Sequence, residues 1–361
     1  MKRVVTQQAG ARGRLRRVEA VGSLTLLLGL ALIVFVGVCG GAGWACSLWG
    51  AIGNWHYGVF VLLLIGLSAL WPAEYGWAGR GILEDGAWFV LSGVFSVVVL
   101  SVVLAGVAWF WQHALSGFNL GVERYLGFWG AALFALMLTD LLGWLVHRAH
   151  HKWRWLWFFH AVHHSQERMN ALSDNRTHIV ENMIGGTVIL LPSLLLGLGT
   201  GAGVRLAFLG IYVSAFIHSN IKTNLGWLGY IFISPQAHRV HHSSKEEHYD
   251  SNYGTIFSFW DVLAGTFHPS RDIYPETGIV DSDFPREARA TSAGIAWLCL
   301  RQTLYPFKQI GRELKREETT AADMLDREPV GGAGVSSESV SARVMRFRRE
   351  LIEKTEALVP A

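Results

Sequence analysis

The chain has 361 residues, of which 51% are hydrophobic and only 16% are charged, and its formal net charge is +3. Soluble domains usually carry about 25% charged residues, so the composition argues against a soluble globular protein. It favours a chain that lies in a bilayer, and we expect no nucleic-acid partner.

Four membrane-spanning helices are predicted in the first part of the chain. No Asp, Glu, Lys or Arg occurs from Ala20 to Ala73, and one crossing needs roughly 20 apolar residues, so this stretch holds two spans. A third span, about Trp88 to Trp111, lies in the charge-free run Gly86 to Val122. A fourth, Tyr125 to Val146, is interrupted only by Asp140.

The basic residues before the first span set the predicted orientation. Residues 1–20 carry six Lys and Arg side chains against Glu19, which the positive-inside rule places in the cytoplasm. A signal peptide is disfavoured because the apolar run continues into a second span. Four crossings then return the chain to the cytoplasm before His147, as in a multi-pass protein of a bacterial-type inner membrane. In the loop between the second and third spans Glu74, Glu84 and Asp85 outnumber Arg80, but acidic residues count little in this rule, so the topology is kept.

The rest of the chain predicts a membrane-dipping helical hairpin and a polar tail. The apolar stretch Asn182 to Ile221 is broken by Pro192 and several glycines, and each half is short for a full crossing. Two full crossings would give the same sidedness. Ala290 to Phe307 is compatible with an interfacial helix, followed by a charged, partly disordered tail that ends in the cytoplasm. The predicted fold is an all-α integral membrane protein with a cytosolic helical cap. Its domains are residues 1–20 (basic terminus), 21–124 (spans), 125–280 (catalytic) and 281–361 (interfacial helix and tail).

Nine of the fifteen histidines fall into three clusters. These are His147-Arg-Ala-His150-His151, His160-Ala-Val-His163-His164 and His238-Arg-Val-His241-His242. Residues three and four apart share a helix face, so each cluster directs two or three imidazoles to one point. Neutral imidazole is a good ligand for iron, zinc, copper and nickel. Three such faces could supply eight or more nitrogens, which is too many for one ion and suits two.

Other metal-site patterns fit less well. Carboxylate-bridged diiron bundles use Glu-x-x-His pairs, and zinc proteases use H-E-x-x-H, neither of which occurs in these clusters. A zinc-dependent membrane hydrolase would need a carboxylate base, for which Glu167 and Glu181 are the nearby candidates. A metal-binding protein or transporter without redox chemistry would need polar ligands along the spans, where only Asp140 occurs.

The clusters and their flanks resemble the fatty acid hydroxylase/sterol desaturase superfamily of membrane diiron enzymes. The pattern H-x3-H, H-x-x-H-H and a distant H-x-x-H-H is met by residues 147–151, 160–164 and 238–242. Asp140 precedes the first box, and Asn252-Tyr253-Gly254, Trp260-Asp261 and Gly265-Thr266-Phe267 follow the third. The stretches 216–220 and 238–267 are similar to alkylglycerol monooxygenase-type members.

The resemblance implies a ligand set and some auxiliary roles. The implied metal ligands are His147, His151, His160, His163, His164, His238, His241 and His242, with His218 as a further one. For His178, ligand, ligand-supporting and structural roles all stay open. Asp140 is a candidate to orient a ligating imidazole. His150 lies one step off the first pair and is not expected to bind metal, and His248 and His268 are expected at the surface.

The tryptophans near the boxes, Trp144, Trp153, Trp155 and Trp157, are interpreted as anchors at the membrane interface.

The predicted function is dioxygen-dependent hydroxylation or desaturation of a C–H bond in a lipid. Fatty acyl chains, sterols or hopanoids, ether lipids and carotenoids remain open, and the flanks slightly favour a hydroxylase. The implied cofactor is a pair of iron ions, with zinc as the alternative metal. Because the chain has no nucleotide-binding or haem-attachment motif, electrons would come from a separate reductase, a ferredoxin or a pterin.

Overall fold

The computed structural model describes residues 55–76, 80–286 and 291–327. Within these ranges the chain is all-helical, with isolated β-bridges and no strand. The basic N-terminal segment, the first predicted span and the end of the tail lie outside the described residues. The helices are α3 (Trp55–Leu70), α4 (Arg80–Phe110), α5 (Glu123–Lys152), α6 (Arg154–His164), α7 (Ile179–Leu195), α8 (Gly199–His218), α9 (Pro235–His241), α10 (Phe259–Ala264) and α11 (Ser292–Arg327). Short 3-10 or π turns lie at Trp111–Leu115, Ser116–Phe118, Ser173–Asn175, Gly226–Tyr230 and Glu246–His248.

The predicted fourth span coincides with α5. Among the described residues α5 is the one helix that is both long and apolar enough to cross a membrane, while Tyr57–Leu70, Ile179–Leu195 and Leu209–His218 are shorter apolar helices. Gly127, at φ 65°, breaks α5 near its start. The all-helical prediction is therefore confirmed for the described residues, and the number of spans stays a prediction.

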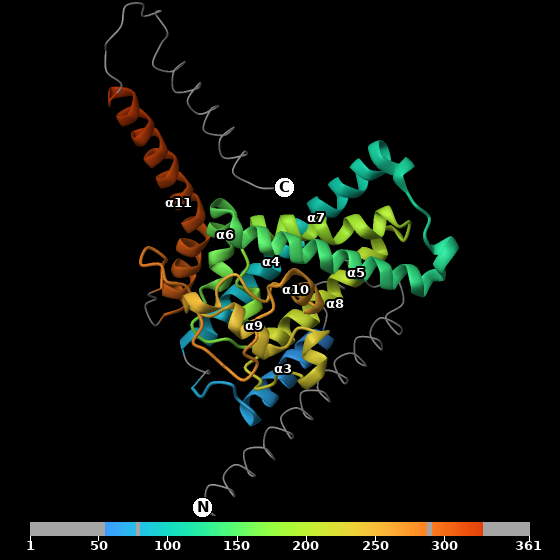
Figure 1. The fold of residues 1–361 in the computed structure, drawn as a ribbon, viewed down its shortest axis with the longest axis horizontal. Coiled ribbons are helices and arrows are strands. Elements are labelled where there is room, and N and C mark those ends of the chain that lie inside the picture. The colour runs from blue at the N-terminus through green and yellow to red at the C-terminus, as the bar shows by residue number, and fades with distance from the viewer. Residues whose placement is uncertain (1–54, 77–79, 287–290, 328–361) are drawn as a thin grey trace, which may run out of the picture. The chain divides into compact units, whose positions relative to one another are not determined.

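Helix α7 occupies the centre of the packing. It contacts α4, α5 and α8, while α6 packs on α5 and α9 packs on α8 (Figure 1). Helices α7 and α8 are joined by residues 196–198, which is the helix pair expected for the hairpin. The histidine-bearing helices α5, α6, α8 and α9 are thereby brought to one region.

The chain divides into two compact units, residues 1–303 and 304–361. All the histidine clusters belong to the first unit. Helix α11 extends to Arg327, about five turns beyond the segment predicted to be interfacial, because the charged residues after Arg312 continue the helix.

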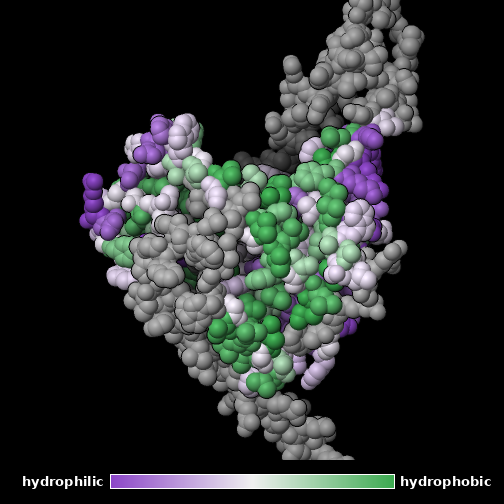
Figure 2. Space-filling view, turned by 180° about the vertical axis from the view of Figure 1, so that it is seen from behind, coloured by the Kyte–Doolittle hydropathy of each residue, from purple (hydrophilic) through white to green (hydrophobic). Residues whose placement is uncertain are grey.

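Large apolar side chains are exposed on several helices. They gather in a broad band on the face that Figure 2 shows. The most exposed include Leu62 on α3, Val90 and Val102 on α4, and Trp129 and Leu133 on α5, each more than half exposed. Contiguous apolar surface of this kind is unusual on a soluble monomer.

A buried ionic cluster ties the start of α4 to the turn after the second histidine box. The Arg176 guanidinium, 4% exposed, pairs with the fully buried Asp85 and with Glu84 at 2.9 Å. Asn170 and Ser173 also donate to Asp85. Since a buried charge is costly without partners, this cluster fixes α4 beside the second box.

We expect Arg176→Leu to destabilise the protein by about 3–5 kcal/mol, because it leaves the buried Asp85 and the partly buried Glu84 without their cation. Thermal unfolding in detergent measures the effect. The control is Lys152→Ala, which removes an exposed pair with Asp250 and should cost at most about 1 kcal/mol. Equal shifts for both variants would contradict this role for the cluster.

Candidate metal centre

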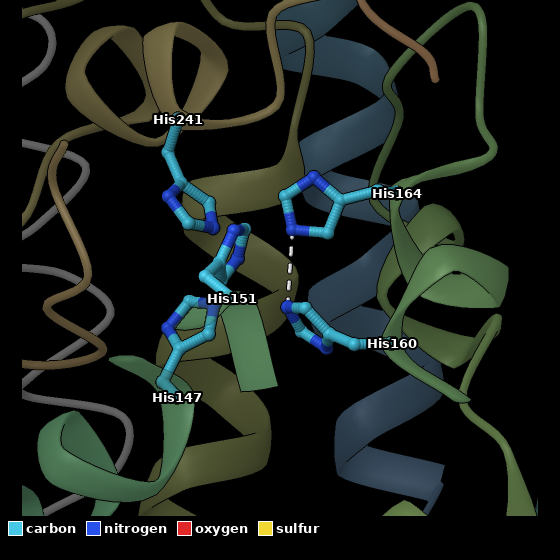
Figure 3. A group of neighbouring side chains, drawn as sticks. All are labelled: His147, His151, His160, His164 and His241. Atoms are coloured by element: carbon cyan, nitrogen blue, oxygen red, sulfur yellow. Dashed lines mark hydrogen bonds between the residues drawn. The ribbon is translucent and has the colours of Figure 1, made fainter. Parts of the chain in front are cut away.

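Nine histidines converge into two adjacent groups. The first group is His147, His151, His160, His164 and His241, and the second is His163, His218, His238 and His242. In each group the nearest ring nitrogens all lie within 4.8 Å of one another. Figure 3 shows the first group, whose rings point toward a common centre. All nine residues that the sequence named as ligands are thus brought together.

Helical spacing explains how one short helix serves both groups. On α6, His160 and His164 are one turn apart and join the first group, whereas His163 joins the second. On α9, His241 joins the first group, and His238 on the same helix joins the second. The groups therefore share two helices, which holds them side by side.

The separations of the ring nitrogens fit coordination to a metal ion. The distance between Nε2 atoms is 3.0 Å for His160 and His164. It is 3.2 Å for His163 and His218, and 2.9 Å for His218 and His238. Ligands about 90° apart at a metal–nitrogen distance of about 2.1 Å would be roughly 3.0 Å apart.

The Nδ1 atoms of several rings are held by acceptors outside the groups. His147 donates to the Tyr253 carbonyl, His241 to the Ser251 carbonyl and His218 to the Ser214 carbonyl, each at 2.8 Å. A ring that donates through Nδ1 keeps its lone pair on Nε2, the atom that faces the group. The Nε2 atoms of His147, His151 and His241 are buried and have no hydrogen-bond partner among the described residues. A cation would satisfy these atoms.

Glu181, at the start of α7, is the carboxylate that contacts a histidine of the first group. Its Oε1 accepts from His160 Nδ1 at 2.8 Å, and its side chain is 16% exposed. A carboxylate in this position orients the ring and raises its basicity as a ligand. The sequence pointed to Glu181 only as a base for the hydrolase alternative. Its position in the first turn of the helix after the second box is a signal that could have indicated this contact.

Gln166 supports His242 in the second group. The amide nitrogen of Gln166 lies 3.1 Å from His242 Nδ1, while its buried Oε1 has no partner. With the amide turned over, Oε1 accepts from His242 Nδ1–H. His242 Nε2 is then free to face the group.

Burial keeps the imidazoles of α6 and α9 neutral. Desolvation, reinforced by neighbouring imidazoles, lowers the pKa of His160, His163 and His164 well below the usual value. The same causes lower the pKa of His238 and His242, and burial lowers the pKa of His241 to about 4. Neutral rings at physiological pH have their lone pairs available for a cation.

The loop after the third box is held by Asp261. This fully buried carboxylate accepts from the backbone N–H groups of Tyr253 and Gly254 and from the indole of Trp144, at 2.8 to 3.0 Å. A Cβ on Gly254 would lie 2.6 Å from the Phe257 carbonyl oxygen, so a side chain does not fit there. The flanking motifs therefore fix the loop whose carbonyls hold His147 and His241.

Asp140 forms hydrogen bonds with the same loop. Its carboxylate accepts from the backbone N–H groups of Ile256 and Phe257 and from the Trp260 indole, at 3.0 to 3.1 Å. These bonds tie α5 to the loop, and no hydrogen bond to an imidazole is present among the described residues. The expected orientation of a ligand by Asp140 is therefore indirect in this structure.

The structure selects one of the roles left open for His178, and it places His248 and Trp144 differently from their sequence-based interpretations. His178 is outside both groups and caps α7, with Nδ1 accepting from Val180 N and Nε2 facing the Thr303 carbonyl, which favours the structural role. His248 was expected at the surface but is 4% exposed and contacts Ser243. Trp144 is buried rather than interfacial because its indole donates to Asp261, whereas Trp153 and Trp155 are exposed.

A cavity of about 450 Å³ adjoins both groups. His147 and His160 of the first group and His163, His218 and His238 of the second line it. The wall continues along α5 through residues 146, 143, 140, 139 and 136 and along α7 and α8 with mainly apolar or small residues. One molecule in this cavity would therefore reach both groups.

Comparison with known proteins confirms the family resemblance. Residues 132–266 match the family model Fatty acid hydroxylase. An ornithine lipid hydroxylase of Rhizobium tropici is 26% identical over 215 residues, covering 59% of this chain and 61% of the relative. An alkylglycerol monooxygenase of Caenorhabditis elegans is 31% identical over 42% of this chain and 30% of the relative. Human cholesterol 25-hydroxylase is 28% identical over 37% of this chain and 50% of the relative.

The matches thus span between about a third and three fifths of these relatives' lengths. No solved structure matches the chain.

We expect two metal ions per chain, one for each group. His241→Ala, in the first group, and His218→Ala, in the second, should each lower the bound metal toward one ion per chain, measured by elemental analysis of the purified protein. His178→Asn serves as the control, since Asn is a good helix cap and this site lies outside both groups. A wild-type content of one ion, or full occupancy in both alanine variants, would contradict the two-group assignment.

Glu181→Leu should weaken metal binding about 10- to 100-fold, because His160 loses the acceptor of its Nδ1–H. Glu181→Gln keeps an acceptor and should show a smaller loss, which competition with a chelator can measure. The matched control is Glu167→Leu, whose carboxylate is 71% exposed. Unchanged affinity in Glu181→Leu would show that this contact does not support the metal.

Proposed function

We propose that the protein is an iron-dependent, integral-membrane oxidoreductase that uses dioxygen to hydroxylate a C–H bond of a lipid. The observation that carries the proposal is the cavity that adjoins both histidine groups and extends along apolar helices. The names of the matched relatives describe oxidation of an ornithine lipid, an alkylglycerol and cholesterol. All three are hydroxylases or monooxygenases, which favours hydroxylation over desaturation.

The two histidine groups suit two iron ions better than zinc. Structural and catalytic zinc sites are typically four-coordinate, with three protein ligands in catalytic sites, whereas the first group offers five imidazoles. Iron bound by these groups would supply the activation of dioxygen. The overall reaction consumes one dioxygen, two electrons and two protons per C–H bond, and yields the alcohol and water. The electrons come from a separate donor, a reductase, a ferredoxin or a pterin.

The chain's own residues prepare this chemistry in several ways. The carbonyls of Tyr253 and Ser251 and the Glu181 carboxylate orient ligand rings. Burial of the histidines of α6 and α9 excludes water from the ligand sphere. The apolar part of the cavity wall favours a hydrocarbon over water.

The direction of the cavity supports a lipid substrate. Along α5 it extends from His150 to Leu136, a helical distance of roughly 21 Å. If α5 crosses the membrane with its histidine end at the cytoplasmic surface, the cavity reaches well into a hydrocarbon core about 30 Å thick. We therefore retain the four-span topology, with both termini and the histidine groups on the cytoplasmic side of an inner membrane.

The test is lipid oxidation by the iron-loaded protein. Purified wild-type protein, a reductase–ferredoxin pair and bacterial lipid extract should consume oxygen and give lipids that have gained one oxygen atom. With isotopically labelled oxygen gas, mass spectrometry should find the label in the product. His241→Ala should lose the activity, while His268→Ala, outside both groups, should keep it.

Two outcomes would point elsewhere. Zinc in the protein purified from cells, with no oxygen uptake after iron loading, would favour the hydrolase alternative. Products that have lost two hydrogens and carry no label would make the enzyme a desaturase.

A further inference from the structure

Three glycines from different helices face the cavity. Gly143 on α5, Gly185 on α7 and Gly210 on α8 line it, and a Cβ added at any of them would meet no atom within 4 Å. Each of the three glycines is half-buried. The open space before these glycines is therefore the cavity and not bulk solvent.

The three positions lie at different depths. Gly143 precedes His147 by four residues, and Gly185 follows Glu181 by four, so both are about 6 Å along their helices from the histidine end. Gly210 precedes His218 by eight residues, about 12 Å away. Side chains at 143 and 185 would fill space close to the histidines, and one at 210 would fill the deeper part.

A second, independent observation points to a ligand at the histidine end. His150 lines the cavity and is 3% exposed. Its Nδ1 faces the Val146 carbonyl at 2.8 Å, and its Nε2 has no partner among the described residues. Glu181 Oε2 and Asn182 Nδ2, on other lining residues, are also buried without a partner. Buried polar atoms normally have partners, and a polar group of a bound molecule could supply them.

We propose that Gly143, Gly185 and Gly210 are specificity-determining positions that keep the cavity open for one hydrocarbon chain of a membrane lipid. A polar group of the same lipid lies at the histidine end, near His150 and Asn182. The carbon attacked is then close to that polar group and not in the middle of the chain. This inference rests on the proposed function and adds which part of the lipid enters and where it is oxidised.

Substitutions at the glycines test the inference without an expected loss of folding. Alanine and leucine form helices better than glycine, and a Cβ at each of the three positions meets open space. The Ala and Leu variants should therefore unfold at the wild-type temperature or above. Gly93→Leu is the matched control, because Gly93 is a helical glycine of α4 with no atom near its Cβ and does not line the cavity.

The readouts are the lipids that copurify with each variant and the products that each forms. Gly210→Leu should shift both sets toward shorter chains. Gly143→Leu and Gly185→Leu should lower kcat/KM at least about tenfold, the usual scale for one or more methylenes competing for space in an apolar pocket. Gly93→Leu should match the wild type. Should a leucine variant fail to fold, the corresponding alanine variant carries the same comparison.

Asn182→Leu tests the polar end. It should raise KM and spread the position of oxidation along the chain, as located by fragmentation of the product. Oxidation of the wild-type product in the middle of the chain would overturn this part of the inference.

Failure of the proposed function can be distinguished from failure of the role proposed for the glycines. A wild-type protein that oxidises no lipid would contradict the proposed function. The chain lengths of the copurifying lipids would still show whether the glycines determine which lipid binds. An active wild type whose folded glycine variants keep the same bound lipids and products overturns the role of the glycines.

Discussion

Nine imidazole rings packed into one small volume are stable only while they stay neutral or bind cations. Nine protonated rings would repel one another strongly in a site where burial already disfavours charge. The structure keeps the rings neutral by burying them, and it sets the tautomer of several by giving their Nδ1–H groups fixed acceptors. Four of these acceptors are the carbonyls of Ser214, Ser251 and Tyr253 and the carboxylate of Glu181. Asp261 and Asp140 hold the loop that carries two of these carbonyls.

The acidic residues of the loop between the second and third predicted spans also have partners beside the histidines. Glu84 and Asp85 pair with Arg176, which follows the second box. Glu74 pairs with the buried Arg239 inside the third box. These acids are therefore partners of cations beside the histidines and not free loop charges. The pairing holds Glu74, Glu84 and Asp85 beside the histidine groups, which agrees with the side that the predicted topology gives them.

The sequence was sufficient to predict that the histidines of the three boxes converge. It could not predict which groups accept hydrogen bonds from their rings. Spacing of three and four residues identifies shared helix faces, so the three boxes were predictable, and the family resemblance added His218. The acceptors of Nδ1 were not predictable, because most are backbone carbonyls that every residue carries. His178 could have been a ligand by its residue type, but in the structure it is the N-cap of α7 and accepts from Val180 N. Asp140 was recognisable as an unusual acid in a predicted span, yet its partner is a loop more than a hundred residues away, which no local pattern reveals.

Sequence patterns did not predict the cavity either, because part of its wall is formed by glycines, which have no side chain. Glycine within a helix is destabilising by roughly 0.5–1 kcal/mol relative to alanine. Glycine is also used in helices where a neighbouring group comes close to the backbone. Gly203 is an example, because a Cβ there would lie 3.0 Å from Leu190 Cδ2. Gly143, Gly185 and Gly210 have no such neighbour, and unlike Gly93, which is equally open, they line the cavity. Their cost is understandable if the space that they leave is filled by a molecule that is not part of the chain. The histidine groups and the empty helix faces then belong to one site, in which the position of the bound molecule relative to both groups decides the chemistry.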